Sequence, residues 1–443
     1  MYKQCWAADG TTHWGYFEDE SVDDLQEAGW LWSQKILSKS GIDENSRVLE
    51  IGCGNGAVSV WLAEQAGCPV VGIDLSSVRI DNARKMAEQH PDARVTFFCG
   101  SITDMPFEDG QFTHVWGQGV LYHVPDLDRA FAEVARVLAP RGVVLIDDFV
   151  GPQAPVSEAV HEHFYDRLKF KAKYSHEEYI DALKGLSLMP VETIDMGKHI
   201  ERTYALVTRA AETIDEDTAE IFRVCGRGVA SREIVGYFYK CVKVLDPRKW
   251  AYESETSTDI AIRYDAWAHS YDGSMEGQYD SPERAAEQLA RHVTDKSTQI
   301  LDVGCGTGLV GQALASAGYT QLHGLDMSRE MLKVAEQKQC YSRLFQFDLV
   351  ADADVEPYPA IVAVGCVTYG HAPGYTLARL YSWLTPGGVL HITVRRDFMA
   401  DDRFFKPLLD GLRWDLLEEE SWTIAGDTQH MAGLLLKKHP SAT

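Results

Sequence analysis

The 443-residue sequence lacks the marks of a membrane or secreted protein. No stretch approaches the roughly 18 unbroken apolar residues that a membrane-spanning helix needs. The N-terminal segment lacks the charged and then apolar layout of a secretory signal. The nine cysteines are odd in number and include no C-x-x-C pair, which argues against a zinc site and a disulfide framework. We therefore expect a cytoplasmic protein with reduced thiols and no bound metal.

Basic residues are also few, since 42 Lys and Arg stand against 66 Asp and Glu, for a formal net charge of −24. Proteins that bind nucleic acids neutralise phosphates with Lys and Arg, so we expect no nucleic-acid partner. An acidic surface suits a cationic or zwitterionic small molecule better. The length exceeds that of one ordinary core and predicts two or three domains, while the oligomeric state is not indicated.

Two stretches of the chain repeat one pattern, VLEIGCGNG at 48–56 and ILDVGCGTG at 300–308. In each, an apolar run and an acid lead into Gly-Cys-Gly-x-Gly, and a second acid follows 22 residues after the first glycine. VLAPRGVVLI at 137–146 also matches WLTPGGVLHI at 383–392. The aligned positions are Glu50, Gly52, Gly54, Gly56 and Asp74 in the first copy, and Asp302, Gly304, Gly306, Gly308 and Asp326 in the second. The chain is thus interpreted as two copies of one domain.

Short apolar runs alternate with segments of helical periodicity in both copies. The first copy has runs at 46–52, 69–75, 94–100, 112–118 and 142–150, with helical segments at 57–66, 77–89 and 127–139. The second has runs at 298–304, 321–327, 344–350, 360–366 and 388–395, with helical segments at 309–317, 329–337 and 375–385. This alternation predicts an α/β fold: two Rossmann-like domains, each a doubly wound, mostly parallel sheet. Ligands of such sheets bind at the carboxyl ends of the strands, where both glycine loops fall.

The predicted domain limits are 1–248 for the first copy and 261–443 for the second, joined by a polar linker at 249–260. A long stretch at 218–245 is predicted to be helical and has no obvious counterpart in the second copy. Together with the residues from about 153 onward, it is interpreted as a helical cap over the substrate. A helix that bridges the domains is the alternative.

The glycine loops predict a nucleotide-containing cofactor. Glycines after a strand let the backbone turn sharply and approach a ligand, and an acid at the tip of the next strand can accept hydrogen bonds from ribose hydroxyls. The spacing Gly52-x-Gly54-x-x-Ala57 also fits NAD. However, Glu50 and Asp302 would repel a pyrophosphate and suit the positive charges of S-adenosylmethionine. The alternative role for Asp74 and Asp326 is an N-cap of the following helix.

Both copies resemble class I S-adenosylmethionine-dependent methyltransferases, over about 100 residues each. E-x-G-C-G-x-G and D-x-G-C-G-x-G match the first motif of this family, and Asp74 and Asp326 match its ribose-binding acid. The resemblance implies S-adenosylmethionine as cofactor and S-adenosylhomocysteine as product. It assigns further cofactor contacts to Leu75, Ser101, Ile102 and Gln118 in the first copy, and to Met327, Asp348 and Leu349 in the second. Ser101 departs from the acid that the family usually has at this position.

The segment FTHVWGQGVLYHVPD at 112–126 resembles the W-S-Q-D-x-x-x-H motif of sarcosine/dimethylglycine-type and phosphoethanolamine-type N-methyltransferases. His123 matches the family histidine, and Gly119 replaces the family aspartate. The resemblance implies a catalytic or acceptor-positioning His123, with helix capping as the alternative. In the phosphoethanolamine enzymes this histidine pairs with an N-terminal tyrosine, which makes Tyr16 a candidate catalytic partner of His123. Trp14 and Tyr16 are candidate lid residues over the cofactor, or ordinary N-terminal packing.

The second copy opens with IRYDAWAHSYDGSM at 262–275, which resembles the Y-D-x-W-A-x-x-Y-D entry helix of small-molecule methyltransferases. Tyr264 and Tyr271 lie two helical turns apart on one face, so both are expected to cover the cofactor. Tyr369 and His371 are the candidate catalytic residues at the end of the fourth strand.

The leading functional hypothesis is a bifunctional methyltransferase that makes successive N-methylations on one small metabolite, an amine or a zwitterion. One catalytic domain with a regulatory or scaffolding partner domain is the alternative. O-, S- or C-methylation, and a binding protein without turnover, also stay open, because cofactor residues do not identify the nucleophile.

Overall fold

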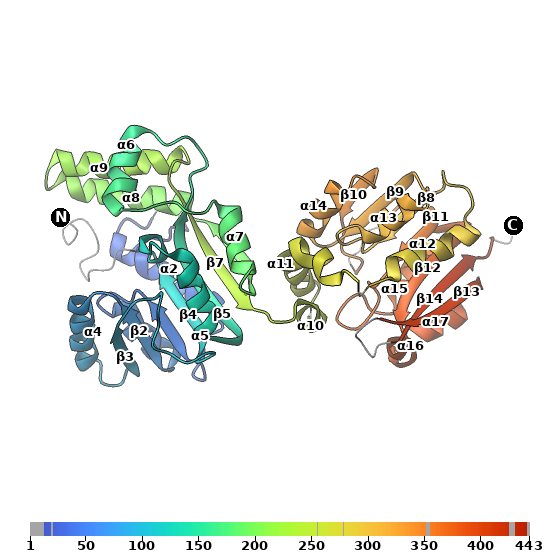
Figure 1. Ribbon diagram of the computed structural model, residues 1–443, viewed down its shortest axis with the longest axis horizontal. Coiled ribbons are helices and arrows are strands. Elements are labelled where there is room, and N and C mark those ends of the chain that lie inside the picture. Colours follow the sequence, from blue (N-terminus) through green and yellow to red (C-terminus); the bar gives the residue numbers. More distant parts are fainter. Residues whose placement is uncertain are drawn as a thin grey trace. The chain divides into compact units, whose positions relative to one another are not determined.

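The computed structural model describes residues 13–18, 21–254, 256–277, 279–350, 355–424 and 430–440. The chain divides into two compact units, residues 1–245 and 246–443, which we call unit 1 and unit 2 (Figure 1). Each unit is built around its own seven-stranded sheet.

The sheet of unit 1 has the strand order β3-β2-β1-β4-β5-β7-β6. Its strands are β1 Val48–Ile51, β2 Val70–Asp74, β3 Val95–Cys99, β4 Phe112–Gln118, β5 Leu138–Val150, β6 Leu188–Asp195 and β7 Val235–Lys243. The pairs from β3 to β5 are parallel, and β7 is antiparallel to both of its neighbours. The chain crosses over after each parallel strand, so the carboxyl ends of β1, β2, β3 and β4 meet at one edge.

Unit 2 repeats this topology as β10-β9-β8-β11-β12-β14-β13, with β14 antiparallel to its neighbours. Its strands are β8 Gln299–Val303, β9 Gln321–Asp326, β10 Arg343–Gln346, β11 Tyr358–Ala363, β12 Leu384–Arg395, β13 Trp414–Thr423 and β14 His430–Lys438. The prediction of two doubly wound, mostly parallel α/β sheets is confirmed.

Helices flank each sheet (Figure 1). In unit 1 they are α2 Leu25–Ser40, α3 Ala57–Ala66, α4 Ser77–Gln89, η1 Leu121–His123, α5 Leu127–Val137, α6 Glu158–Val160, η2 His161–Asp166, α7 His176–Lys184, α8 Gly197–Glu212 and α9 Glu216–Ala230. In unit 2 they are α10 Pro247–Tyr252, α11 Ser257–Met275, α12 Ser281–His292, α13 Leu309–Ser316, α14 Arg329–Gln337, α15 Thr376–Ser382, α16 Arg396–Asp401 and α17 Phe405–Gly411.

Both faces of each sheet are buried. Neighbouring strand residues point to opposite faces, so Val115 and Trp116 of β4 enter different clusters of the core, and both are fully buried. Unit 2 is organised in the same way, with Ile361 and Val362 of β11 on opposite faces. Burial on both faces explains why these strands are continuous apolar runs in the sequence.

The predicted helical cap at 153–245 is wrong in part, because β6 and β7 within it belong to the sheet. Helix α9 ends at Ala230, the chain turns at Arg232 with a φ of 64°, and β7 begins at Val235. The segment 235–243 is rich in aromatic and β-branched residues, which favour a strand. Strand β7 also has a counterpart in unit 2, namely β14. Of the helices in this region, α6, η2, α8 and α9 pack together (Figure 1).

The predicted linker at 249–260 is also wrong, because it contains the end of α10 and the start of α11. The Asp246 side chain caps α10 by accepting from the Lys249 amide, and Pro247 is the first helical residue. Proline at this position fits a helix start, since it lacks only an amide hydrogen that has no helical partner there. The boundary between the units lies between Leu245 and Asp246.

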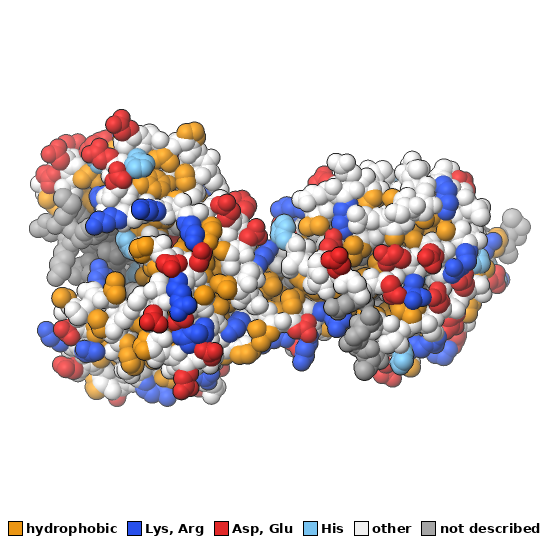
Figure 2. All heavy atoms as spheres, in the orientation of Figure 1, with side chains coloured by type: hydrophobic (Ala, Val, Ile, Leu, Met, Phe, Trp, Pro, Cys, Tyr) orange, Lys and Arg blue, Asp and Glu red, His pale blue; other side chains and the backbone are white. Residues whose placement is uncertain are grey.

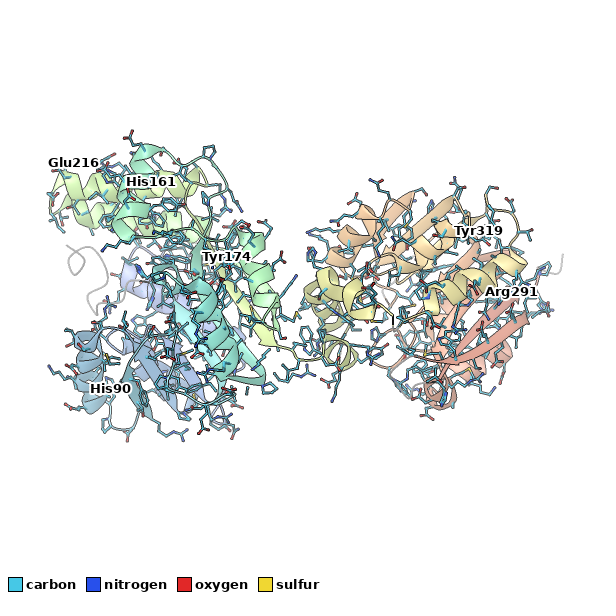
Figure 3. The ribbon with its side chains drawn as sticks, viewed as in Figure 1. His90, His161, Tyr174, Glu216, Arg291 and Tyr319 are labelled. Carbon is cyan, nitrogen blue, oxygen red and sulfur yellow. The ribbon has the colours of Figure 1, made fainter. Side chains whose placement is uncertain are left out.

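Acidic and basic side chains are interspersed on the face of each unit shown in Figure 2. In unit 2, for example, Arg291 of α12, labelled in Figure 3, donates from Nε to Glu418 of β13 at 3.2 Å. Within the described ranges, no helix is both long enough and apolar enough to span a bilayer.

Candidate active sites

The glycine loop of each unit needs residues without a side chain. Gly52, Gly54 and Gly56 have φ angles of 64°, 55° and 85°, in the left-handed region that favours glycine. A Cβ at Gly52 would collide with Val120, which follows β4. Gly304 in unit 2 has a φ of 68°, and its Cβ would collide with Cys366, which follows β11. The two loops thus lie against equivalent segments of their sheets.

The acid at the end of the second strand makes the same two hydrogen bonds in both units. The Gly54 amide donates to Oδ2 of Asp74 at 3.0 Å, and the Ser76 amide donates to Oδ1 at 2.8 Å. In unit 2 the Gly306 amide donates to Asp326 at 2.9 Å, and the Ser328 amide donates to it at 2.8 Å. The helix caps are the serines themselves, so the alternative N-cap role for the aspartates is wrong.

The loop after the third strand is fixed by its own side chain in each unit. Ser101 Oγ accepts from the Thr103 amide at 3.2 Å, and Asp348 Oδ1 accepts from the Val350 amide at 2.8 Å. Ser101 therefore takes the local turn role of the acid that it replaces.

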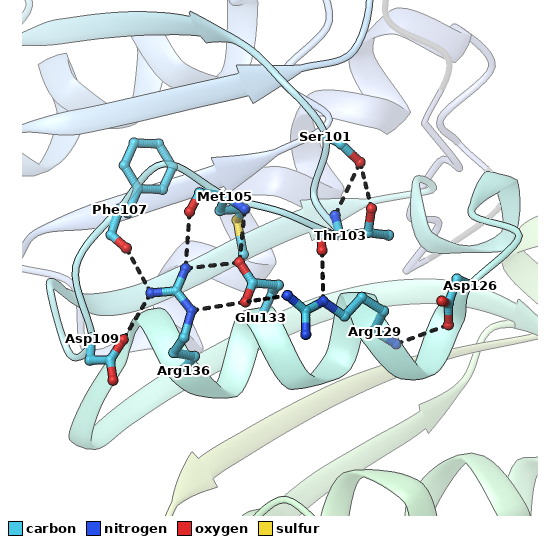
Figure 4. Close-up of polar contacts among 9 residues, drawn as sticks. All are labelled: Ser101, Thr103, Met105, Phe107, Asp109, Asp126, Arg129, Glu133 and Arg136. Atoms are coloured by element: carbon cyan, nitrogen blue, oxygen red, sulfur yellow. Dashed lines mark hydrogen bonds and ion pairs between the residues drawn. The ribbon is translucent and has the colours of Figure 1, made fainter.

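Helix α5 holds this loop of unit 1 in place (Figure 4). Arg129 donates to the Thr103 carbonyl at 3.0 Å, and Glu133 accepts from the Met105 amide at 2.8 Å. Arg136 pairs with the same Glu133 at 2.8 Å and lowers the pKa of its carboxyl.

A pocket of about 530 Å³ opens at the carboxyl ends of the strands in unit 1. The predicted site residues that line it are Gly52, Gly54, Asp74, Leu75, Ser101, Ile102, Gln118 and His123. Gly56 does not line it and is instead the N-cap residue of α3, where a Cβ would collide with Phe97 and Ala83.

Unit 2 has a pocket of about 800 Å³ at the equivalent place. The predicted site residues that line it are Tyr264, Tyr271, Gly304, Gly306, Asp326, Met327, Asp348, Leu349 and His371. Gly308 is the N-cap residue of α13 and does not line the pocket. Both volumes lie in the range of small-molecule sites.

The residues of these pockets fit a nucleoside cofactor. The carboxylates of Asp74 and Asp326 keep lone pairs that ribose hydroxyls can use. Leu75, directly after Asp74, is 76% exposed, which leaves an apolar surface where a base can pack.

Residues 49–146 and 301–390 each match a family model described as a methyltransferase domain. The chain is 30% identical over 206 residues to the 27-O-demethylrifamycin SV methyltransferase of Amycolatopsis mediterranei, a match over 46% of this chain and 74% of that protein.

The chain belongs to the S-adenosylmethionine-dependent methyltransferases. It is also 29% identical to the methyltransferase GfsG of Streptomyces halstedii, over 46% of this chain and 74% of that protein. It is 28% identical to a glycine/sarcosine/dimethylglycine N-methyltransferase of Actinopolyspora halophila, over 49% of this chain and 38% of that protein. The fold is similar to that of a protein from Galdieria sulphuraria assigned as a sarcosine dimethylglycine methyltransferase, with a TM-score of 0.50, 21% identity, and coverage of 55% of this chain and 97% of that chain.

When bound, S-adenosylmethionine supplies this methyltransferase with a methyl group on a positively charged sulfur. The motif acids Glu50 and Asp302 do not line the pockets, contrary to the prediction that they face the cofactor. They lie below the loops, where Glu50 bonds to the Ser59 hydroxyl and Asp302 accepts from Tyr341 at 2.5 Å. Burial raises the pKa of Glu50 to about 8 and that of Asp302 to about 7.

Compared with the wild type, the Glu50→Gln variant is expected to have an increasingly stable unit 1 as the pH rises. The pKa of Glu50 is about 8 in the folded protein and near 4.5 in an unfolded chain, so the folded state binds the proton more tightly. Its stabilising effect is complete below pH ~4.5 and is lost as the pH rises towards 8. The uncharged glutamine avoids this loss, so its advantage in unfolding free energy should grow by roughly 2–4 kcal/mol between pH 5 and pH 8.

Thermal unfolding of the ligand-free protein at several pH values measures this change. Glu88→Gln is the control, because Glu88 is an exposed residue of α4. Parallel pH dependences of Glu50→Gln and wild type would contradict the expected linkage.

The predicted N-terminal lid residues lie elsewhere. Tyr16 is stacked on His199 with ring centroids 4.5 Å apart and does not line the unit 1 pocket. Trp14 is buried against Phe149, edge-on at 4.7 Å. In this structure both residues pack against other rings, and neither lines the pocket.

His123 does line the pocket of unit 1, and burial lowers the pKa of its imidazole. It is the last residue of η1, and its ring lies against Tyr122, with centroids 4.0 Å apart. A neutral imidazole at this position can accept a proton.

The end of the fourth strand is fixed similarly in both units. The Gly119 amide donates to Asp147 Oδ1 at 2.8 Å, and the Gly365 amide donates to Thr393 Oγ1 at 2.8 Å. Asp147 is buried, and burial raises the pKa of its carboxyl to about 7. The glycine that replaces the family aspartate therefore turns the chain, and the nearby carboxyl holds that turn.

Unit 2 brings two predicted residues into contact that the sequence had placed in different roles. Tyr264 Oη lies 2.6 Å from Nε2 of His371, and Nδ1 of His371 lies 3.1 Å from the Tyr369 carbonyl. A carbonyl only accepts, so Nδ1 carries the proton and Nε2 accepts from Tyr264. Burial lowers the pKa of His371, which keeps the imidazole neutral. The pair can therefore take up a proton at the pocket wall.

Tyr369, predicted to be catalytic, points out of the pocket. Its hydroxyl donates to Asp401 at 3.0 Å, and its ring packs on Phe398 at 5.0 Å. The chain reverses between Tyr369 and His371 at Gly370, which has a φ of 69°, so only the histidine faces inward.

Several lining residues were missed by sequence reasoning. They are His13, Arg79 and Asp126 in unit 1, and Arg248, Lys249, Tyr252, Tyr279, Tyr375 and Arg395 in unit 2. The Asp-Pro start of α10 was the available signal for part of this set, because it marks a helix where a linker was expected.

Proposed function

We propose that the protein is a bifunctional methyltransferase in which each unit binds S-adenosylmethionine and methylates a small metabolite. The duplicated hydrogen bonds from the glycine loop to Asp74 and to Asp326 carry this proposal. Both units keep the carboxylate, the bare backbone and the pocket beside them. One chain that holds two sites raises the local concentration of an intermediate, which favours successive steps on one compound.

Nitrogen is the proposed acceptor atom. An amine must lose a proton around the time of transfer, and each pocket has a histidine whose pKa is lowered by burial. Relatives whose names specify N-methylation include the glycine/sarcosine/dimethylglycine enzyme. The chain is also 27% identical to a tocopherol O-methyltransferase of Arabidopsis thaliana, so oxygen is the competing acceptor atom.

The test uses the full chain with methyl-labelled S-adenosylmethionine and a panel of amines, amino acids, phosphobases, phenols and thiols. We expect two bound cofactors per chain and labelled products that carry the methyl on nitrogen. A single bound cofactor would contradict the two-site proposal, and labelled ethers or thioethers would contradict the choice of nitrogen.

A second function is favoured by one difference between the units. In unit 2, His371 bonds to Tyr264. In unit 1, Tyr16, the predicted partner of His123, stacks on His199 instead. In this alternative unit 2 transfers the methyl group and unit 1 binds the cofactor as a regulatory module. Disabling each unit separately distinguishes the two proposals, as argued in the Discussion.

A further inference from the structure

Three basic side chains line the unit 2 pocket. Arg248 and Lys249 of α10 and Arg395 at the end of β12 line it. Apart from Asp326 and Asp348, which are assigned to the cofactor, Asp246 is the only acid among the described lining residues. The bases thus outnumber the acids that are not assigned to the cofactor, in a protein whose formal net charge is −24.

Helix α10 is a fixed wall of this pocket. Trp250 is 5% exposed, and the Arg263 guanidinium of α11 lies 5.4 Å from the centre of its ring. Arg263 also donates to the Trp250 carbonyl. On the other side, Gly370 lies directly against the Tyr252 carbonyl, where a Cβ would collide with it. The bases of α10 are therefore held beside the site by contacts within unit 2.

Tyrosine hydroxyls meet in the same region. Burial raises the pKa of Tyr264, Tyr271 and Tyr279, and the proximity of Tyr252 adds to the shift in all three. The Tyr252 ring lies 4.7 Å from that of His371. These phenols are consequently neutral hydrogen-bond donors beside the proton-accepting pair.

Arg395 is oriented for recognition. Its Nε donates to Asp397 at 3.0 Å, its Nη2 donates to the same carboxylate, and its guanidinium lies 5.2 Å from the centre of the Tyr369 ring. This ion pair fixes the plane of the guanidinium and leaves three of its five N–H groups for a carboxylate or a phosphate. Unit 1 has a different arrangement, because Arg79 is the only Lys or Arg among the described residues that line its pocket.

We infer that the methyl acceptor of unit 2 carries an anionic oxygen group, a carboxylate or a phosphate, which binds Arg248 and Arg395 while its nucleophile faces Tyr264 and His371. This inference rests on the proposed function of unit 2. It also makes α10 part of the acceptor site. The acceptor of unit 2 is therefore a zwitterion or an anion, and not a simple amine.

The test compares amines that differ only in the anionic group, in full-length protein saturated with S-adenosylhomocysteine. Phosphoethanolamine is paired with ethanolamine, and sarcosine with dimethylamine, and binding is measured by calorimetry. The anionic member of one pair should bind at least about tenfold more tightly, as expected for a charge-assisted hydrogen bond. The pair that shows the preference distinguishes a phosphate from a carboxylate.

Arg248→Met and Arg395→Met should each reduce this preference about tenfold or more. Arg396→Met is the matched control. This substitution removes the same charge, but Arg396 pairs with Glu419 outside the pocket. Equal binding of charged and neutral amines, or an equal loss in Arg396→Met, would overturn the inference. The affinity for S-adenosylhomocysteine, measured in the same samples, tests the proposed function separately. If a variant loses the preference for the anionic amine and keeps its cofactor affinity, the anion site is supported. If the protein binds the anionic amine but not the cofactor, only the proposed function is overturned.

Discussion

Asp74→Ala should remove one of two S-adenosylmethionine binding sites and leave the other intact, and Asp326→Ala should do the reverse. Each carboxylate is expected to accept hydrogen bonds from the ribose, and it also holds a glycine-loop amide at 3.0 Å or 2.9 Å. Hydrogen bonds to a charged group contribute about 1.5–3 kcal/mol each, so the loss of two predicts an affinity lower by roughly a hundredfold or more. Calorimetric titration of the full chain gives both the stoichiometry and the affinity.

Matched controls remove a nearby acid from the helix that follows. Asp81 of α4 pairs with Arg84, and Glu330 of α14 pairs with Lys333. Asp81→Ala and Glu330→Ala should keep two sites of wild-type affinity. If Asp74→Ala abolishes binding at both sites, or at neither, the units do not bind the cofactor independently.

The same variants decide between two enzymes and one enzyme with a regulatory domain. With two enzymes, Asp74→Ala and Asp326→Ala each stop a different methylation, and the intermediate accumulates in one of them. With a regulatory unit 1, Asp74→Ala changes the rate or its cofactor dependence but removes no product. Product analysis by mass spectrometry separates these outcomes.

His371→Ala is expected to slow methyl transfer in unit 2 by about 10²–10³-fold, as for the loss of a general base. Its Nε2 lies 2.6 Å from Tyr264 Oη, and the two groups form one path for the proton. Tyr264→Phe should therefore have a similar effect, and the double variant should be little slower than the slower single variant. Single-turnover rates at saturating cofactor and acceptor measure this step.

The pH profile provides a second readout for this pair. Burial lowers the pKa of His371, so the imidazole stays neutral to a lower pH than an ordinary histidine with a pKa near 6.5. The rate should consequently persist below pH ~6.5 in wild type and lose its acid limb in His371→Ala. Tyr381→Phe is the control, since its hydroxyl donates to the Arg413 carbonyl outside the pocket. Additive effects of Tyr264→Phe and His371→Ala would show that the two residues act separately.

Much of the fold could be read from the sequence because its signals are local. Buried parallel strands must be apolar on both faces, and the glycines of the loops must adopt a positive φ, so both leave a direct record in the residue types. The duplicated spacing of glycines and acids likewise predicted which carboxylates meet the loops, and Asp74 and Asp326 lie there.

The roles of individual side chains depended on tertiary contacts. Glu50 and Asp302 belong to the motif, yet the direction in which a strand points its side chains buries them below the loops. Tyr16 stacks on His199, and Tyr369 donates to Asp401. Part of the predicted linker is helix α10, whose Trp250 packs against Arg263. These outcomes follow from packing between segments far apart in the chain, and spacing along the sequence carries no record of such contacts.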